Sequence, residues 1–163
     1  MSPPDKLSPV VRRLVTDAGT TTQSFGLGRV VGQIYAYLYF SREPRCLSDL
    51  ERVLGISKGS ASMGVRQLEQ WDAVRKVWVK GDRKDYFQAS DWFGKILKRA
   101  LVDTVTRKMG TYSRMLQDIE ERIPEEAEDP EEEFVRDRLE HLRTFHDRVV
   151  GFWDNPVVQR LLK

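Results

Sequence analysis

Residues 46–89 read CLSDLERVLGISKGSASMGVRQLEQWDAVRKVWVKGDRKDYFQA, and this stretch decides the fold. Its pattern predicts a helix that ends at Gly55, a second helix from Ser57 to Trp71, and then a two-stranded hairpin with a charged tip. A short strand over 45–47 is expected before them. This order of elements is that of a winged helix-turn-helix, whose second helix and hairpin, the wing, can lie against nucleic acid.

Short polar residues and a glycine are expected to set the helix ends. Ser48 followed by Glu51 has the capping-box pattern, in which an N-cap serine is paired with a glutamate three residues later. Gly55 is expected to end the first helix of the pair, since glycine adopts the left-handed conformation that closes many helices. Ser57 is the expected N-cap of the second helix.

The second helix has one apolar and one polar face. Ala61, Val65 and Leu68 follow helical spacing and are expected to face the core. Small residues in the first turn would let the helix start approach a phosphate closely. Arg66 is the best candidate for a bidentate contact to guanine. The residues expected to contact DNA from this helix are Lys58, Gly59, Ser60, Ser62, Met63, Arg66 and Gln67.

Two glycines, Gly59 and Gly64, lie inside this helix. A glycine in a helix interior is less favourable than alanine by about 1 kcal/mol, so each glycine needs a reason. One interpretation is close approach of the backbone to DNA. The other is packing against a neighbouring helix. The sequence favours the first interpretation for Gly59 and does not separate the two for Gly64.

The wing tip is basic. Its cations are Lys80, Arg83 and Lys84, and Gly81 followed by Asp82 provides turn chemistry. Arg83 is the natural probe of a narrow minor groove, where negative potential is concentrated. Asp85 is interpreted as a partner that orients Arg83 or Lys84 through an ion pair. The alternative is a solvated hairpin tip that contacts nothing.

The remainder of the chain is expected to be helical, so the fold class is mainly α with a small β-hairpin. Apolar spacing predicts helices over about 8–19, 28–40, 97–123 and 134–153, and a terminal helical turn over 157–163. The expected domains are an N-terminal arm and dimerisation helix over 1–27, the winged helix-turn-helix over 28–91, and a C-terminal helical dimerisation region over 92–163.

The helix predicted over 97–123 carries a heptad seam. From Val105 to Ile123 the apolar residues are separated by 4, 3, 4, 3 and 4 positions, a spacing typical of helices that pack side by side. A homodimer is the preferred interpretation, and a helical hairpin folded onto the helix at 28–40 is the alternative. The expected dimerisation residues are Leu101, Val105, Met109, Tyr112, Leu116, Ile119, Leu142 and Val149.

The charge distribution points to a polyanionic partner. Residues 1–99 hold 17 Lys and Arg against 10 Asp and Glu, whereas residues 100–163 hold 10 against 15. The basic part is the part that contains the predicted winged helix, which favours binding to double-stranded DNA. No run of about 18 apolar residues predicts a membrane span. The N-terminus lacks the pattern of a signal peptide, so a cytoplasmic location is expected.

Patterns typical of catalysis or cofactor binding are absent from the sequence. Cys46 is the one cysteine, so a disulfide within the chain is excluded, and it is interpreted as a small buried residue rather than a redox switch. His141 and His146 are poorly spaced for one metal site. No glycine-rich phosphate loop occurs. The sequence therefore predicts neither an enzyme nor a bound cofactor.

The run from Leu47 to Ala89 closely resembles the GbsR-like branch of the MarR-type winged helix-turn-helix transcriptional regulators. The match is carried by LSDLERVLGISKGSASMGVRQLEQW and VRKVWVKGDRKDYF. The resemblance implies a dimeric DNA-binding regulator, most simply a repressor acting on an inverted-repeat operator. It also implies that 57–71 is the recognition helix and 81–84 the wing tip. The family pattern favours glycine after Trp71, where this chain has Asp72.

The sequence leaves two alternatives, one about a small effector and one about the function of the winged helix. Such regulators often bind a small effector, for which Tyr35, Trp92 and Tyr112 are candidates, although aromatic residues at helical spacing are more often core. The alternative function is a winged-helix protein-interaction module without sequence-specific DNA binding. Apolar residues on the exposed face of the recognition helix and wing would favour that alternative, whereas the charged residues found there favour DNA.

Overall fold

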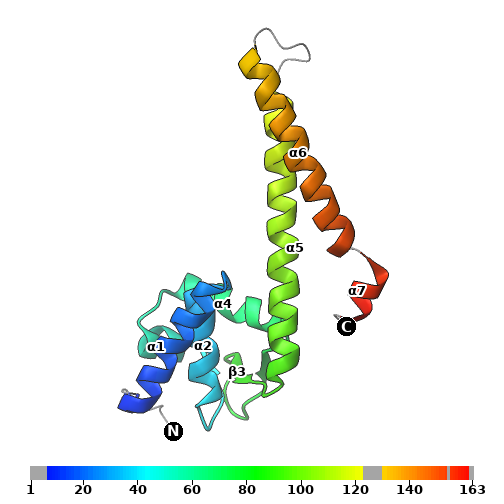
Figure 1. Cartoon of the computed structure of the whole chain (residues 1–163). Helices are drawn as coiled ribbons and strands as arrows, with labels where there is room; N and C mark the ends of the chain where they lie inside the picture. The colour runs from blue at the N-terminus through cyan, green and yellow to red at the C-terminus, as the bar shows by residue number, and fades with distance from the viewer. Residues whose placement is uncertain (1–6, 123–129, 154, 162–163) are drawn as a thin grey trace. The chain divides into compact units, whose positions relative to one another are not determined.

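The computed structural model describes residues 7–122, 130–153 and 155–161. It divides into two compact units, residues 1–101 and residues 102–163, and each is considered by itself (Figure 1). The helices of the first unit are α1 (Pro9–Ser24), α2 (Arg29–Tyr39), α3 (Leu47–Leu54), α4 (Lys58–Gln70) and the first turns of α5 (Phe93–Glu120). The prediction of a mainly helical chain with a small sheet is confirmed.

A three-stranded antiparallel sheet completes the first unit. Its strands are β1 (Arg45–Cys46), β2 (Val74–Val77) and β3 (Tyr86–Ala89), in the order β1-β3-β2. The short strand predicted before α3 therefore pairs with the second strand of the hairpin. Strands β2 and β3 form the predicted hairpin, with residues 78–85 as the wing between them.

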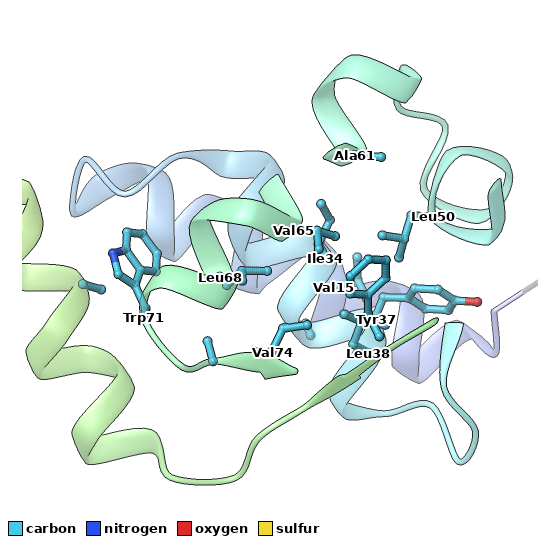
Figure 2. Packing of buried hydrophobic residues seen from close by; sticks show 14 residues of the cluster. Val15, Ile34, Tyr37, Leu38, Leu50, Ala61, Val65, Leu68, Trp71 and Val74 are labelled. Atoms are coloured by element: carbon cyan, nitrogen blue, oxygen red, sulfur yellow. The ribbon is translucent and has the colours of Figure 1, made fainter. Parts of the chain in front are cut away.

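The core of the first unit gathers around Ile34 of α2, whose side chain has no exposed surface. Leu50 from α3 and Val65 from α4 point toward it, as Figure 2 shows. Ala61, Val65 and Leu68 are all buried, as the helical spacing predicts. Because α4 is fixed through this face, its opposite face is left at the surface.

Helix α1 is longer than predicted. The helix predicted over about 8–19 does not end at Gly19 but continues to Ser24. Gly19 is buried instead where α1 crosses α2. The Thr22 hydroxyl donates to the carbonyl oxygens of Ala18 and Gly28, at 3.0 and 2.9 Å, and so joins the end of α1 to the start of α2. Tertiary packing here overrides the local tendency of glycine to end a helix.

Helix α3 begins two residues earlier than predicted. Its N-cap is Cys46 rather than Ser48, and the acidic residue of the cap is Asp49 rather than Glu51. The Asp49 carboxylate accepts a hydrogen bond from the Cys46 backbone N–H at 3.2 Å. Pairing of β1 with β3 fixes Cys46 in extended conformation, and the helix starts directly after it. Gly55 ends the helix in the left-handed conformation, as predicted.

The second unit contains α5 from residue 102, α6 (Pro130–Trp153) and α7 (Pro156–Leu161). Helices α5 and α6 run in opposite directions (Figure 1). The Trp153 indole donates to the Thr106 hydroxyl at 3.3 Å, and Arg143 pairs with Glu120 at 2.5 Å. The end of the helix predicted over about 97–123 lies outside the described residues. No described helix has the length and apolar character needed to cross a membrane.

Candidate nucleic-acid interface

The amino end of α4 is open. Ser57, Lys58 and Gly59 are exposed, and no other described part of the chain covers them. The Ser57 hydroxyl accepts from the Ser60 backbone N–H at 3.1 Å, which confirms the predicted N-cap. The N–H groups of Lys58 and Gly59 have no acceptor within the helix, as at every helix start. The positive end of the helix dipole therefore faces solvent, where an anion can reach it.

The outward face of α4 combines cations, small polar side chains and one methionine. Lys58 and Arg66 are exposed and make no ion pair with any described residue. Gln67 donates to Gln70 at 3.0 Å, so its amide is already oriented at the surface. Ser60 and Ser62 are half-buried, and Met63 is fully at the surface. Every α4 residue singled out from the sequence as a DNA contact thus lies on the accessible face or at its edge.

The structure separates the roles of the two glycines of α4. A Cβ at Gly64 would lie 2.6 Å from Cδ1 of Ile34, inside the core. A Cβ at Gly59 would meet only the Ser57 Oγ, at 3.9 Å. Gly64 therefore allows α4 to pack closely on α2. Nothing within the described chain requires a glycine at position 59, which leaves close approach of an outside partner as its expected role.

We expect Gly64→Ala to lower the free energy of unfolding by about 1–2 kcal/mol, because the new methyl group overpacks a site that Ile34 fills completely. Gly59→Ala is the matched control, and it should leave stability unchanged or raise it by up to about 1 kcal/mol through helix propensity. Urea denaturation of the two variants measures both effects. Equal losses of stability would contradict the assignment of Gly64 to packing.

The wing tip is held by Asp82. Its carboxylate accepts from the Lys84 backbone N–H at 3.0 Å and from the Tyr86 hydroxyl at 2.8 Å. The first of these bonds, helped by the second, lowers the pKa of the Asp82 carboxyl, and the Tyr86 bond raises the pKa of that phenol to about 12. Gly81 turns the chain with a φ of 88°. The tip is therefore a defined loop, from whose backbone the basic side chains extend.

The acidic residues of the wing do not neutralise its tip. Asp85 was interpreted as a partner of Arg83 or Lys84, but it pairs with Lys76 on β2 at 2.6 Å. Lys80, Arg83 and Lys84 are exposed and have no ion pair within residues 7–122, 130–153 and 155–161. The Asp82 carboxylate accepts hydrogen bonds from the Lys84 backbone N–H and the Tyr86 hydroxyl and makes no ion pair with these side chains, so the three cations are available to an anionic partner.

Trp78 is a surface residue that the sequence analysis missed. The run Val77-Trp78-Val79 reads as part of a strand, yet β2 ends at Val77. Trp78 is 79% exposed, more than the other large apolar side chains of the described chain. The signal that would have revealed it is the alternation of Lys76, Trp78 and Lys80, since residues two apart in an extended segment share a face.

Asp72 occupies the position where the family pattern favours glycine. Its φ is 56°, so it adopts the left-handed conformation that glycine would provide. The aspartate also adds interactions that a glycine lacks, because its carboxylate pairs with Arg99 and, at 3.7 Å, with Lys95 on α5. The departure from the family pattern therefore keeps the turn after α4 and connects it to the next helix.

The three residues suggested for an effector lie in different surroundings. The Tyr35 hydroxyl donates to the Ser90 carbonyl at 2.6 Å, and its ring contacts those of Tyr39 and Phe93. Burial raises the pKa of Tyr35 to about 12. Trp92 is 72% exposed. Tyr112 belongs to the second unit, whereas Tyr35 and Trp92 belong to the first. An effector site formed by all three residues stays a prediction.

Cys46 is buried, as predicted, and its Sγ lies 3.3 Å from the Asp49 carboxylate and 3.0 Å from the Ser48 hydroxyl. His146 contacts the Met109 carbonyl oxygen of α5 through Nε2 at 3.3 Å. Within the described residues, no three His, Cys, Asp or Glu side chains are grouped as metal ligands. Cys46 and His146 thus each have contacts within the fold.

Comparison with known proteins finds transcriptional repressors among the similar sequences. No protein-family profile matches the chain. It is 25% identical over 158 residues to the HTH-type transcriptional repressor OpcR of Bacillus subtilis, covering 90% of this chain and 85% of that protein. It is 35% identical over 85 residues to the repressor GbsR of the same organism, covering 52% of this chain and 47% of that protein.

Among solved structures, one described as a transcriptional regulator superposes with a TM-score of 0.58 at 21% identity, covering 94% of this chain and 96% of the other. At this identity the superposition supports the fold alone.

The fold and its similarities define the class: a winged helix-turn-helix protein related to transcriptional regulators. Within that class, the resemblance to GbsR-like regulators is confirmed over about half of the chain, because the repressor GbsR is among the similar proteins. These relatives are regulators and not enzymes, in agreement with the lack of a catalytic pattern in the sequence.

Proposed function

We propose that the chain is a transcriptional repressor that binds an inverted-repeat operator as a homodimer. Helix α4 lies in the major groove, and the wing contacts the adjacent minor groove. Arg66 reads a guanine, Lys58 and the amino end of α4 bind phosphate, and Arg83 enters the minor groove. Lys80 and Lys84 add phosphate contacts.

The observation that carries this proposal is the set of exposed cations on α4 and the wing, all without an ion pair in the described chain: Lys58, Arg66, Lys80, Arg83 and Lys84. Ion pairs form elsewhere on this surface, as between Lys76 and Asp85. Cations left unpaired on one helix face and one hairpin tip are what a polyanion requires.

The homodimer is supported by the apolar surface of the second unit. Helix α6 has no buried residue among those described, and Phe134, Phe145 and Phe152 are each more than half exposed. Tyr112 and Ile119 of the heptad seam are exposed as well. A face of this kind is unfavourable in water, and a second copy of the chain would cover it. Two copies would also read the two halves of an inverted repeat.

We expect Arg66→Ala to weaken binding to a selected genomic duplex by about 1–3 kcal/mol and to relax the preference for one base pair. Lys84→Ala should weaken binding to every sequence alike, because a phosphate contact carries no sequence information. The measurement is a gel-shift titration on a genomic fragment pool and on the fragment that it selects. An unchanged base preference in Arg66→Ala would contradict the role of α4.

Repeating the titration at two salt concentrations tests the proposal against its alternative. If phosphates are neutralised, the logarithm of the association constant falls linearly with the logarithm of the salt concentration, by roughly 0.9 for each phosphate contact. A winged helix that serves only to bind another protein would bind no duplex. Absence of binding at low salt would therefore favour the protein-interaction module.

A further inference from the structure

Trp78 lies on the wing but has no part in holding the wing together. Its side chain is 79% exposed, and it has no hydrogen bond or ring contact with the rest of the described chain. The fixed parts of the loop are Asp82, Tyr86 and the Lys76–Asp85 pair. Removing the indole therefore costs the fold little, and an exposed indole on a stable loop needs another explanation.

The surroundings of Trp78 indicate the kind of partner. Lys76, Trp78 and Lys80 are exposed, whereas Val77 and Val79 between them are half-buried. Lys76 ends its side chain in the ion pair with Asp85, and Lys80 begins the turn at the wing tip. The unpaired cations of the wing that holds Trp78 are therefore Lys80, Arg83 and Lys84. The wing thus combines an exposed flat apolar group with free cations.

We propose that Trp78 is a DNA contact, in which the indole packs against the sugar walls of the minor groove while the unpaired Lys80 reaches a phosphate. The groove is about 6 Å wide, which admits an aromatic ring edge-on. Apolar side chains are known to enter this groove and to press against or between base steps. This inference rests on the proposed DNA-binding function and adds an apolar contact to it.

A protein partner is the competing occupant, because an exposed tryptophan is also a frequent centre of protein interfaces. Two features favour DNA. The flanking residues are lysines, which are depleted from protein interfaces, and the unit that contains the wing carries the excess of positive charge.

The test compares Trp78→Ala with Phe25→Ala, a control whose aromatic side chain is also exposed, at 56%, and has no role in the proposed interface. Binding is measured by fluorescence anisotropy on a genomic duplex selected by the wild-type protein and on a random-sequence duplex of equal length. We expect Trp78→Ala to bind the selected duplex about tenfold more weakly, Trp78→Phe to recover part of that loss, and Phe25→Ala to bind as the wild type does. All variants should melt at the wild-type temperature.

Salt dependence separates the apolar contact from its charged neighbours. The slope of the logarithm of the association constant against that of the salt concentration should be unchanged in Trp78→Ala and should fall by about 0.9 in Lys80→Ala, since only the lysine displaces counterions. If Trp78→Ala bound DNA with wild-type affinity, the proposed DNA contact of Trp78 would be wrong. The exposed indole would then favour a protein partner. Absence of wild-type binding to any duplex would overturn the proposed function itself.

Discussion

Gly32→Ala should destabilise the folded chain by about 3 kcal/mol, the upper end of the usual effect of overpacking. A Cβ at this position would lie 2.5 Å from the Ala18 carbonyl oxygen and would also overlap the Thr22 hydroxyl. The carbonyl belongs to the backbone of α1, so no side-chain rotation relieves the overlap. Thr22 is held in turn by its hydrogen bonds to Ala18 and Gly28.

Urea denaturation measures this change through the transition midpoint, with all proteins at one concentration because a dimer gains apparent stability with concentration. Gly94→Ala is the matched control: position 94 is also helical, and nothing lies within 4 Å of a Cβ placed there. We expect the control to match or slightly exceed wild-type stability. A midpoint of Gly32→Ala equal to that of the control would show that α1 and α2 do not cross as closely as described.

Leu116→Glu should convert the proposed homodimer into monomers. Leu116 lies in the heptad seam of α5 and is only half-buried in the single chain, so a dimer would cover the rest of it. Placing a carboxylate there in both copies would bury two charges without partners, at several kcal/mol each. The dissociation constant should therefore rise roughly a thousandfold or more.

Sedimentation velocity over a range of protein concentrations checks this result. Gln117→Glu places the same charge one position along, at an exposed residue outside the seam, and should remain dimeric. Circular dichroism of both variants should show the wild-type helix content. A stable dimer of Leu116→Glu would remove this seam from the interface, and loss of the dimer in both variants would assign the effect to charge alone.

Local sequence signals predicted the recognition helix well. Ser57 caps α4, Gly55 ends α3 in the left-handed conformation, and the buried and exposed faces of α4 are those expected from helical spacing. These features depend on hydrogen bonds and contacts between residues three or four apart, which the order of residues specifies directly. The cations expected at the surface of α4 and the wing are also exposed.

The errors have a common origin in contacts between distant segments. Gly19 reads as a helix end, but it lies where α1 crosses α2, and α1 continues to Ser24. Ser48 reads as an N-cap, but the pairing of β1 with β3 moves the cap to Cys46. Asp85 pairs across the hairpin with Lys76. Each outcome was fixed by a neighbour that is remote in sequence, which a local pattern cannot identify.

By itself, the sequence determined that the chain has a winged helix-turn-helix, where its recognition helix begins, and which side of that helix is polar, because short-range periodicity and capping specify these. The tertiary structure alone decided that Gly64 serves the core and that Asp82 holds the wing. It also decided that Trp78 is left at the surface, because exposure depends on which segments pack over a residue, and those segments come together only in the folded chain.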